Sequence, residues 1–134
     1  MNLRLSPFVL AAALAAALAT PLTAAAETPR DFLQRFEREA GAAGSHARGA
    51  QFFSSRHGND WSCASCHTES PMVAGRHAKT DKPIRPLAPI ANAERLSDPA
   101  KVDKWFRRNC NDVLGRACSA QEKADVVAFL IAQK

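Results

Sequence analysis

Two cysteines and a histidine lie close together near the middle of the chain, in the run Cys63-Ala64-Ser65-Cys66-His67. In a Cys-x-x-Cys-His run, the two thiols add to the vinyl groups of a haem and the adjacent histidine is held beneath the iron. A thioredoxin-like dithiol or half of a zinc site shares the Cys-x-x-Cys spacing. No βαβ pattern surrounds this motif, however, and no second pair of ligands follows at zinc spacing. The motif therefore predicts one covalently bound haem c, with His67 as the proximal iron ligand.

The ligand on the other side of the iron separates electron carriers from proteins that bind small molecules, because electron carriers usually place a Met or a second His there. Met72 follows His67 by five residues. At roughly 3.4 Å per residue that chain reaches only about 17 Å, within which it has to round the haem edge. His77 lies within reach but in a polar loop bounded by prolines, and we interpret His46 and His57 as surface imidazoles.

Asn109 is a further candidate ligand, because it shares a helical face with Trp105 and has enough chain before it to cross the haem. Trp105 one turn away, with Val102 or Phe106, is then a candidate for the lining of a distal pocket, although an ordinary core position suits Trp105 equally well. Asn109 also suits the cap at the C-terminal end of a helix, and these features alone favour that cap.

The first residues are typical of a secretory signal peptide: Arg4, an apolar run from Phe8 to Leu18, and the small residues Ala24-Ala25-Ala26. The apolar run is too short to span a bilayer. We therefore expect a signal peptide over residues 1–26, one domain over residues 27–134, export to the periplasm and no membrane-spanning segment.

The remaining cysteines, Cys110 and Cys118, are eight positions apart. In an oxidising compartment they can close a small loop as a disulfide, which stabilises by roughly 2.6 kcal/mol on a loop-entropy basis. Two buried free thiols are the alternative.

The chain carries 18 basic and 13 acidic residues, a formal charge of +5. The basic residues are spread over several segments rather than gathered in one stripe, and together with export this argues against nucleic acid as a partner. The positive surface favours acidic redox partners.

Helical spacing of apolar residues predicts an all-α fold of about four or five helices. A first helix starts at Thr28-Pro29 and stops at Gly41, and a second covers about residues 46–56. We expect the Gly49 to Phe53 part of the second helix to pack against a terminal helix around Phe129.

The second half of the chain begins with a proline-rich segment, residues 68–93, which predicts a loop that wraps the haem and gives little support to strands. Ser97-Asp98-Pro99 then starts a helix before the Cys110 to Cys118 loop. Ser119-Ala120-Gln121-Glu122 is a capping box at the start of the terminal helix.

The run from Arg108 to Cys118, Arg-Asn-Cys-Asn-Asp-Val-Leu-Gly-Arg-Ala-Cys, resembles the sphaeroides haem protein family, oxygen-binding c-type cytochromes with a class I-like fold. The haem motif, Pro86-Leu87-Ala88-Pro89, Val102-Asp103-Lys104-Trp105 and Glu122-Lys123-Ala124-Asp125 are similar to their counterparts there. The likeness covers most of the chain after residue 26, and the Asn-Cys pair with a second Cys eight residues later is its most specific part.

The resemblance implies that Asn109 ligates ferric iron and that Cys110 forms a disulfide with Cys118. It also implies that ferrous iron releases Asn109 and binds a diatomic ligand such as O2 or NO, and that the redox partners are cytochromes, including a dihaem cytochrome c. A conventional electron carrier with two fixed iron ligands is the alternative. An open iron site also permits turnover of O2, NO or peroxide, but no distal acid/base pair is identifiable, so enzyme status stays open.

Overall fold

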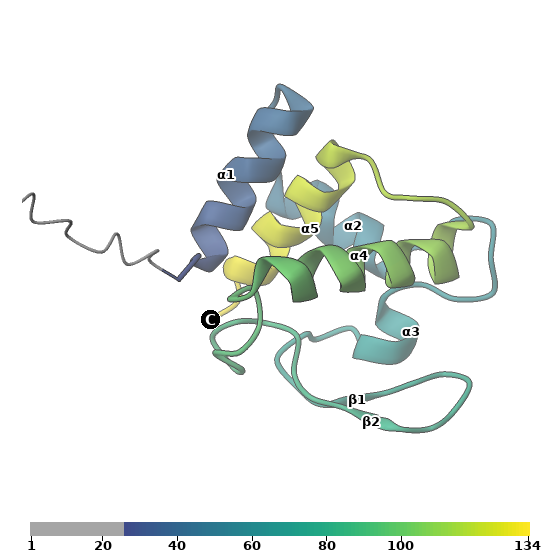
Figure 1. The fold of residues 1–134 in the computed structure, drawn as a ribbon. Helices are drawn as coiled ribbons and strands as arrows, with labels where there is room; N and C mark the ends of the chain where they lie inside the picture. The colour runs from purple at the N-terminus through teal and green to yellow at the C-terminus, as the bar shows by residue number, and fades with distance from the viewer. Residues whose placement is uncertain (1–25) are drawn as a thin grey trace, which may run out of the picture.

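The computed structural model describes residues 26–134, which form five helices and one pair of very short strands (Figure 1). The expected signal peptide lies outside these residues, apart from Ala26. The elements are α1 (Pro29–Ala40), α2 (His46–Ser54), α3 (Ala64–His67), β1 (Gly75–Arg76), β2 (Pro83–Ile84), α4 (Pro99–Leu114) and α5 (Ala120–Ile131). The predicted all-α class is confirmed. No described helix is long and apolar enough to cross a membrane.

The helix starts predicted from capping residues are confirmed. At α1 the Thr28 hydroxyl accepts from the Asp31 amide, and the Asp31 carboxylate accepts from the Thr28 amide at 2.8 Å. Ser119 and Glu122 form the same reciprocal pair at α5. The helix α1 ends at Gly41, whose φ of 71° is left-handed. Because these caps use only neighbouring residues, they could be predicted from the sequence.

Helix α5 is the central element, and both α1 and α2 pack on it. At Gly49 the two backbones approach so closely that a Cβ would collide with the carbonyl oxygen of Asp125. One helical turn later the rings of Phe53 and Phe129 lie 5.2 Å apart. The predicted packing of α2 against α5 around Phe129 is therefore confirmed.

Two core clusters lie on either side of α5. The first joins α1, α4 and α5 through Phe32, Phe36, Val102, Ala124 and Val127. The second joins α2, α3 and α5 through Phe53, Ala64, Val126, Phe129 and Leu130. Phe106 of α4 packs against both clusters. In Figure 1, α4 crosses α5, and α3 with the β1–β2 hairpin lies on the side of α4 away from α1.

Helix α2 ends at Ser54, earlier than the predicted residue 56. The Phe52 carbonyl oxygen, which would accept from the Arg56 amide if the helix continued, instead lies 2.8 Å from Nε2 of His57. A side chain thus takes the place of the next backbone hydrogen bond, which lets the chain leave the helix. Gly58 then turns the chain with a φ of 97°.

The proline-rich segment is mostly loop, as predicted, but it contains the short antiparallel pair β1 and β2, although its prolines argued against strands. The pair forms because the intervening turn is closed by backbone hydrogen bonds, from His77 N to Lys82 O at 2.9 Å and from Asp81 N to His77 O at 2.8 Å. Pro83 has no backbone N–H to donate. It is tolerated because both strands of a two-stranded pair are edge strands, where that donor is not required.

Side chains hold the rest of this loop. The Pro86 carbonyl oxygen accepts from Asn92 Nδ2 at 3.1 Å and from Arg95 Nε at 3.0 Å. The Pro71 carbonyl oxygen accepts from the amides of Leu87 and Ala88, each at 2.9 Å. These bonds give a segment without helices a defined path next to α3.

Candidate haem-attachment site

Cys66 and His67 lie in the single turn of α3, and Cys63 is the N-cap residue of that turn. The amides of Cys66 and His67 donate to the Cys63 carbonyl oxygen at 3.2 and 3.0 Å. Ser62 and Ser65 brace the turn, because the Ser62 amide donates to the Ser65 hydroxyl at 2.9 Å and the Ser65 amide donates back at 3.2 Å. The predicted site did not include this serine pair, although its i, i+3 spacing is typical of a local cap.

His67 is held in an apolar environment. Its imidazole lies 6.3 Å from the Phe53 ring, centroid to centroid. Burial lowers the pKa of His67 to about 4, and the positive charge of Arg95 adds to the shift. The imidazole is therefore neutral at physiological pH, which is the form that offers a nitrogen lone pair to a metal.

Cys63 and Cys66 are both free thiols, and each is half-buried. Burial raises the pKa of Cys63 to about 11, so its thiol is neutral. The β1–β2 hairpin lies against Cys66, whose sulfur accepts from the Ala78 amide at 3.2 Å. Gly75 approaches so closely that a Cβ there would collide with the Cys66 carbonyl oxygen. Gly75 could not be predicted as part of the site, because its close approach to Cys66 joins segments nine residues apart.

The donor set fits a c-type haem. Two free thiols stand one helical turn apart beside a neutral imidazole, and Leu87 and Phe106 pack against the same apolar cluster as Cys63. Within residues 26–134, no group of three or more His, Cys, Asp or Glu side chains could hold a metal ion, so nothing completes a zinc site around Cys63 and Cys66.

Asn109 lies inside α4 rather than at its end. The helix continues to Leu114 and is terminated by Gly115, which has a φ of 68° and donates to the Asn111 carbonyl oxygen. The interpretation of Asn109 as a helix cap is therefore wrong. Asn109 is half-buried in this position.

The residue after Asn109 is covalently tied to the start of α5. Cys110 and Cys118 form a disulfide with their Cα atoms 5.5 Å apart, and both are buried. Cys110 belongs to α4 and Cys118 directly precedes the Ser119 cap, so the bond joins α4 to the residue just before α5. The helix carrying Asn109 is thus restrained on its C-terminal side.

The three candidates for a distal pocket lie in different environments. Val102 is buried in the cluster shared by α1, α4 and α5, and Phe106 packs between the two clusters. Trp105 is 43% exposed. Val102 thus has a packing role in the core, and Trp105, four residues before Asn109, is the large apolar side chain on this part of α4 that is not covered by protein.

His77 is engaged in the turn between β1 and β2. Its Nδ1 accepts from the amides of Lys79 at 3.2 Å and Thr80 at 3.3 Å. Because Nδ1 is an acceptor, a neutral ring carries its proton on Nε2 and has no lone pair there for a metal. His77 would have to abandon both turn hydrogen bonds to ligate through Nε2.

The other side chains considered as ligands also have local contacts. The His57 ring lies 4.2 Å from that of Phe52, and the His46 ring lies 5.6 Å from that of Phe129. Met72 is half-buried in the turn after α3.

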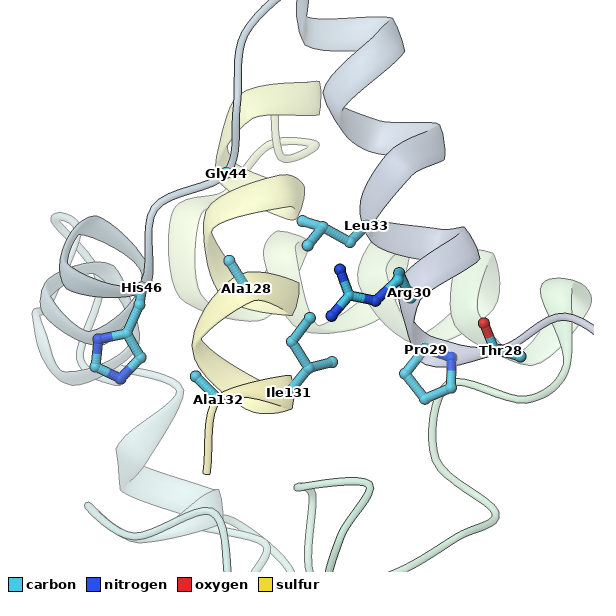
Figure 2. Close-up of a pocket in the computed structure, with 9 residues that line it drawn as sticks. All are labelled: Thr28, Pro29, Arg30, Leu33, Gly44, His46, Ala128, Ile131 and Ala132. Carbon is cyan, nitrogen blue, oxygen red and sulfur yellow. The ribbon is translucent and has the colours of Figure 1, made fainter. Parts of the chain in front are cut away.

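A separate groove of about 570 Å³ opens between α1, α2 and α5. Figure 2 shows Arg30, Leu33 and Ile131 between α1 and α5, with His46 on the α2 side of α5. None of the motif residues and no cysteine lines this groove, which is bordered by Thr28, Pro29, Arg30, Leu33, Gly44, His46, Ala128, Ile131 and Ala132.

Known proteins resemble this chain over most of its length. Residues 39–130 match a family described as a domain of unknown function, DUF1924. The cytochrome c-type protein SHP of Cereibacter sphaeroides is 43% identical over 124 residues, which cover 90% of this chain and 95% of the relative. Cytochrome c'' of Methylophilus methylotrophus is 43% identical over 81 residues, 60% of this chain and 56% of the relative.

Solved structures of c-type cytochromes also superpose on this chain. Oxidized SHP, described as an oxygen-binding cytochrome c, superposes with a TM-score of 0.76 and 41% identity over 81% of this chain and 99% of that one. Oxidized cytochrome c'' gives 0.73 and 34% identity over 79% and 94% of the two chains. A solution structure of cytochrome c'' that addresses haem-ligand detachment gives 0.70 and 34% identity over 78% and 93%.

Proposed function

Because this chain belongs to the SHP family of c-type cytochromes, we propose that it is an exported monohaem cytochrome in which Asn109 gates the binding of a diatomic ligand such as O2 or NO. The observation that carries the proposal is the position of Asn109. Asn109 lies half-buried inside α4, four residues after Trp105, and it directly precedes a cysteine that is fixed by a disulfide.

Cys63 and Cys66 would hold one haem through thioether bonds, and His67 would be the proximal ligand. When bound, the haem supplies an iron that cycles between ferric and ferrous and that can bind a diatomic ligand in the ferrous form. His67 is suited to its role because burial beside Phe53 keeps the imidazole neutral. Ser62 and Ser65 keep both sulfurs and the imidazole on one turn.

Asn109 would act as a weak ligand that is retained only by ferric iron. Its carboxamide oxygen is hard and neutral, so it prefers the harder ferric ion and leaves when the iron is reduced. The disulfide limits how far this part of α4 can move, so Asn109 stays close to the position it vacates. Haem-ligand detachment has a structural precedent in cytochrome c''.

The conventional carrier with a second histidine ligand has less support. His77 accepts two backbone hydrogen bonds at Nδ1, and Nε2 of His57 lies 2.8 Å from a backbone carbonyl oxygen.

Exchange of electrons with other cytochromes, including a dihaem cytochrome c, remains part of the proposal, since a redox gate needs an electron source. Export to the periplasm agrees with the disulfide, which is typical of oxidising compartments.

Optical and electron paramagnetic resonance spectra of the purified haem protein, ferric and then reduced, with and without carbon monoxide, test the proposal. We expect a weak-field ferric centre and a five-coordinate ferrous form that binds carbon monoxide at once. A centre that is low-spin in both oxidation states and that ignores the gas would overturn it in favour of the conventional electron carrier.

A further inference from the structure

The exposed side of α4 carries a row of basic residues with an aromatic side chain among them. Lys101, Lys104 and Arg108 follow one another at spacings of three and four, so they lie along one face of the helix, with Trp105 next to Lys104 and Arg107 next to Arg108. All five residues are exposed. We call these five residues the α4 basic face.

Most of the charge on this face is not neutralised. Lys104, Arg107 and Arg108 form no salt bridge with any residue from 26 to 134. Lys101 lies 3.7 Å from the Asp98 carboxylate, a long and exposed contact. Two further carboxylates lie on the exposed part of α4. Asp103 is paired with Arg35 of α1 at 2.7 Å, and Asp112 stands at the C-terminal end of the row.

Trp105 lies between two of these cations. The Arg108 guanidinium carbon is 5.2 Å from the centre of the indole, and the Lys104 ammonium is 5.7 Å away. Both contacts fall in the range of cation–π attraction, so the cations and the ring support each other's positions.

We propose that the α4 basic face is the docking surface for an electron-transfer protein with a carboxylate-rich surface. The inference rests on the proposed function, in which an electron must reach the iron from another protein. An acidic surface complements the unpaired cations and speeds encounter by electrostatic steering. Trp105 precedes Asn109 by four residues, about 6 Å along the helix axis at ~1.5 Å per residue, so a partner docked here stands next to the helix that carries the iron ligand.

The test uses the intact haem protein and an acidic flavodoxin in its hydroquinone form as the electron donor. Reduction rates are measured by stopped flow for wild type, for the charge-reversal variant Lys104→Glu/Arg108→Glu, and for Arg38→Glu/Lys134→Glu. The last variant changes the net charge equally, but its residues lie on α1 and at the C-terminus and form no salt bridge within the described chain.

At low ionic strength we expect the α4 variant to be reduced at least about tenfold more slowly than wild type, and the control variant no more than about twofold. The difference in reduction rate between the α4 variant and wild type should shrink at about 0.5 M salt, because charges are then screened within a few Å. In addition, carbodiimide should couple flavodoxin carboxylates to Lys101 or Lys104 in preference to Lys79, Lys82 and Lys134.

Equal slowing of both variants would mean that net charge alone matters, and unchanged rates would mean that the partner docks elsewhere; either result overturns the proposal. Binding to phosphatidylglycerol vesicles that is lost in the α4 variant, with an unchanged flavodoxin rate, would assign the face to a membrane surface instead. Ferric and carbon monoxide spectra of the wild type test the proposed function separately, so failure of the docking surface leaves the Asn109 gate standing.

Discussion

The Phe53 ring lies 6.3 Å from the imidazole of His67, centroid to centroid, and is itself only 1% exposed. Phe53 also contacts Phe129 of α5, with the two rings 5.2 Å apart. The expected iron ligand therefore stands against a side chain that is fixed by the packing of α2 on α5. The position of His67 depends on this helix pair as well as on its own turn.

Replacing Phe53 should destabilise the protein and loosen His67 together. We expect Phe53→Ala to lower the free energy of unfolding by about 3 to 5 kcal/mol, because it leaves a cavity at a fully buried site. Urea unfolding followed by haem absorbance measures this loss. Phe52→Ala is the matched control, since Phe52 is its half-buried neighbour on α2, and it should cost clearly less. Equal losses in the two variants would contradict the role given to Phe53.

Asn109→Ala should change the ferric optical spectrum, because the variant has no amide oxygen to offer to the iron. We expect a higher high-spin fraction in the ferric state and an almost unchanged ferrous carbon monoxide spectrum. Asn111→Ala is the matched control, since Asn111 is an exposed asparagine two residues further along α4. If the ferric spectra of wild type, Asn109→Ala and Asn111→Ala coincide, Asn109 is not the ligand.

Removing the disulfide should free the C-terminal part of α4. For Cys110→Ala/Cys118→Ala we expect a loss of roughly 2 to 3 kcal/mol in the free energy of unfolding, from the added freedom of the unfolded chain. Flash photolysis of the carbon monoxide complex should also show altered rebinding rates, because Asn109 is less restrained. Wild type treated with dithiothreitol checks that the effect comes from the bond rather than from the substitutions. Unchanged rebinding rates in both samples would contradict a restraining role.

Acid should weaken the junction between α2 and α5. Burial alone raises the pKa of the Asp125 carboxyl, but hydrogen bonds from Arg48, Ser45 and Gln121 outweigh it and leave the pKa below its ordinary value. These bonds are short, at 2.8 and 2.7 Å to Arg48, 2.7 Å to the Ser45 amide and 2.9 Å to Gln121.

A pKa that is lower in the folded than in the unfolded state means that the unfolded chain takes up the proton more readily. The stabilisation is therefore complete above the unfolded value of about 3.9 and is lost as the pH falls through the lower folded value. Urea titrations from pH 7 to pH 3 should show a steeper loss of stability for wild type than for Asp125→Asn. Asp60→Asn, at an exposed aspartate without a salt bridge in the described chain, should keep the wild-type slope. Parallel profiles for wild type and Asp125→Asn would rule out this role.

Features that depend on neighbouring residues could be predicted from the sequence. The thiols and imidazole at Cys63, Cys66 and His67 fit on one helical turn whatever the rest of the chain does, so their spacing alone indicates a haem site. The starts of α1 and α5 follow from the caps at Thr28 and Ser119, which need only the residue three positions later.

The environment of each candidate ligand was decided by tertiary contacts. Asn109 had the local features of a helix cap, but α4 continues to Leu114, with Cys110 and Val113 buried and the disulfide joining Cys110 to Cys118 just before α5. Val102 became a core residue because α1 and α5 pack against that side of α4. The approach of Gly75 to Cys66 also joins residues from separate segments.

The sequence by itself thus determined the all-α class, the main helix starts and the haem motif, because capping and motif geometry act over three or four residues. Only the tertiary structure decided that Asn109 lies half-buried inside α4 and that His67 lies against Phe53. The reason is physical. Whether a polar side chain is free depends on burial and on partners brought from distant segments, and these exist only after the helices have packed.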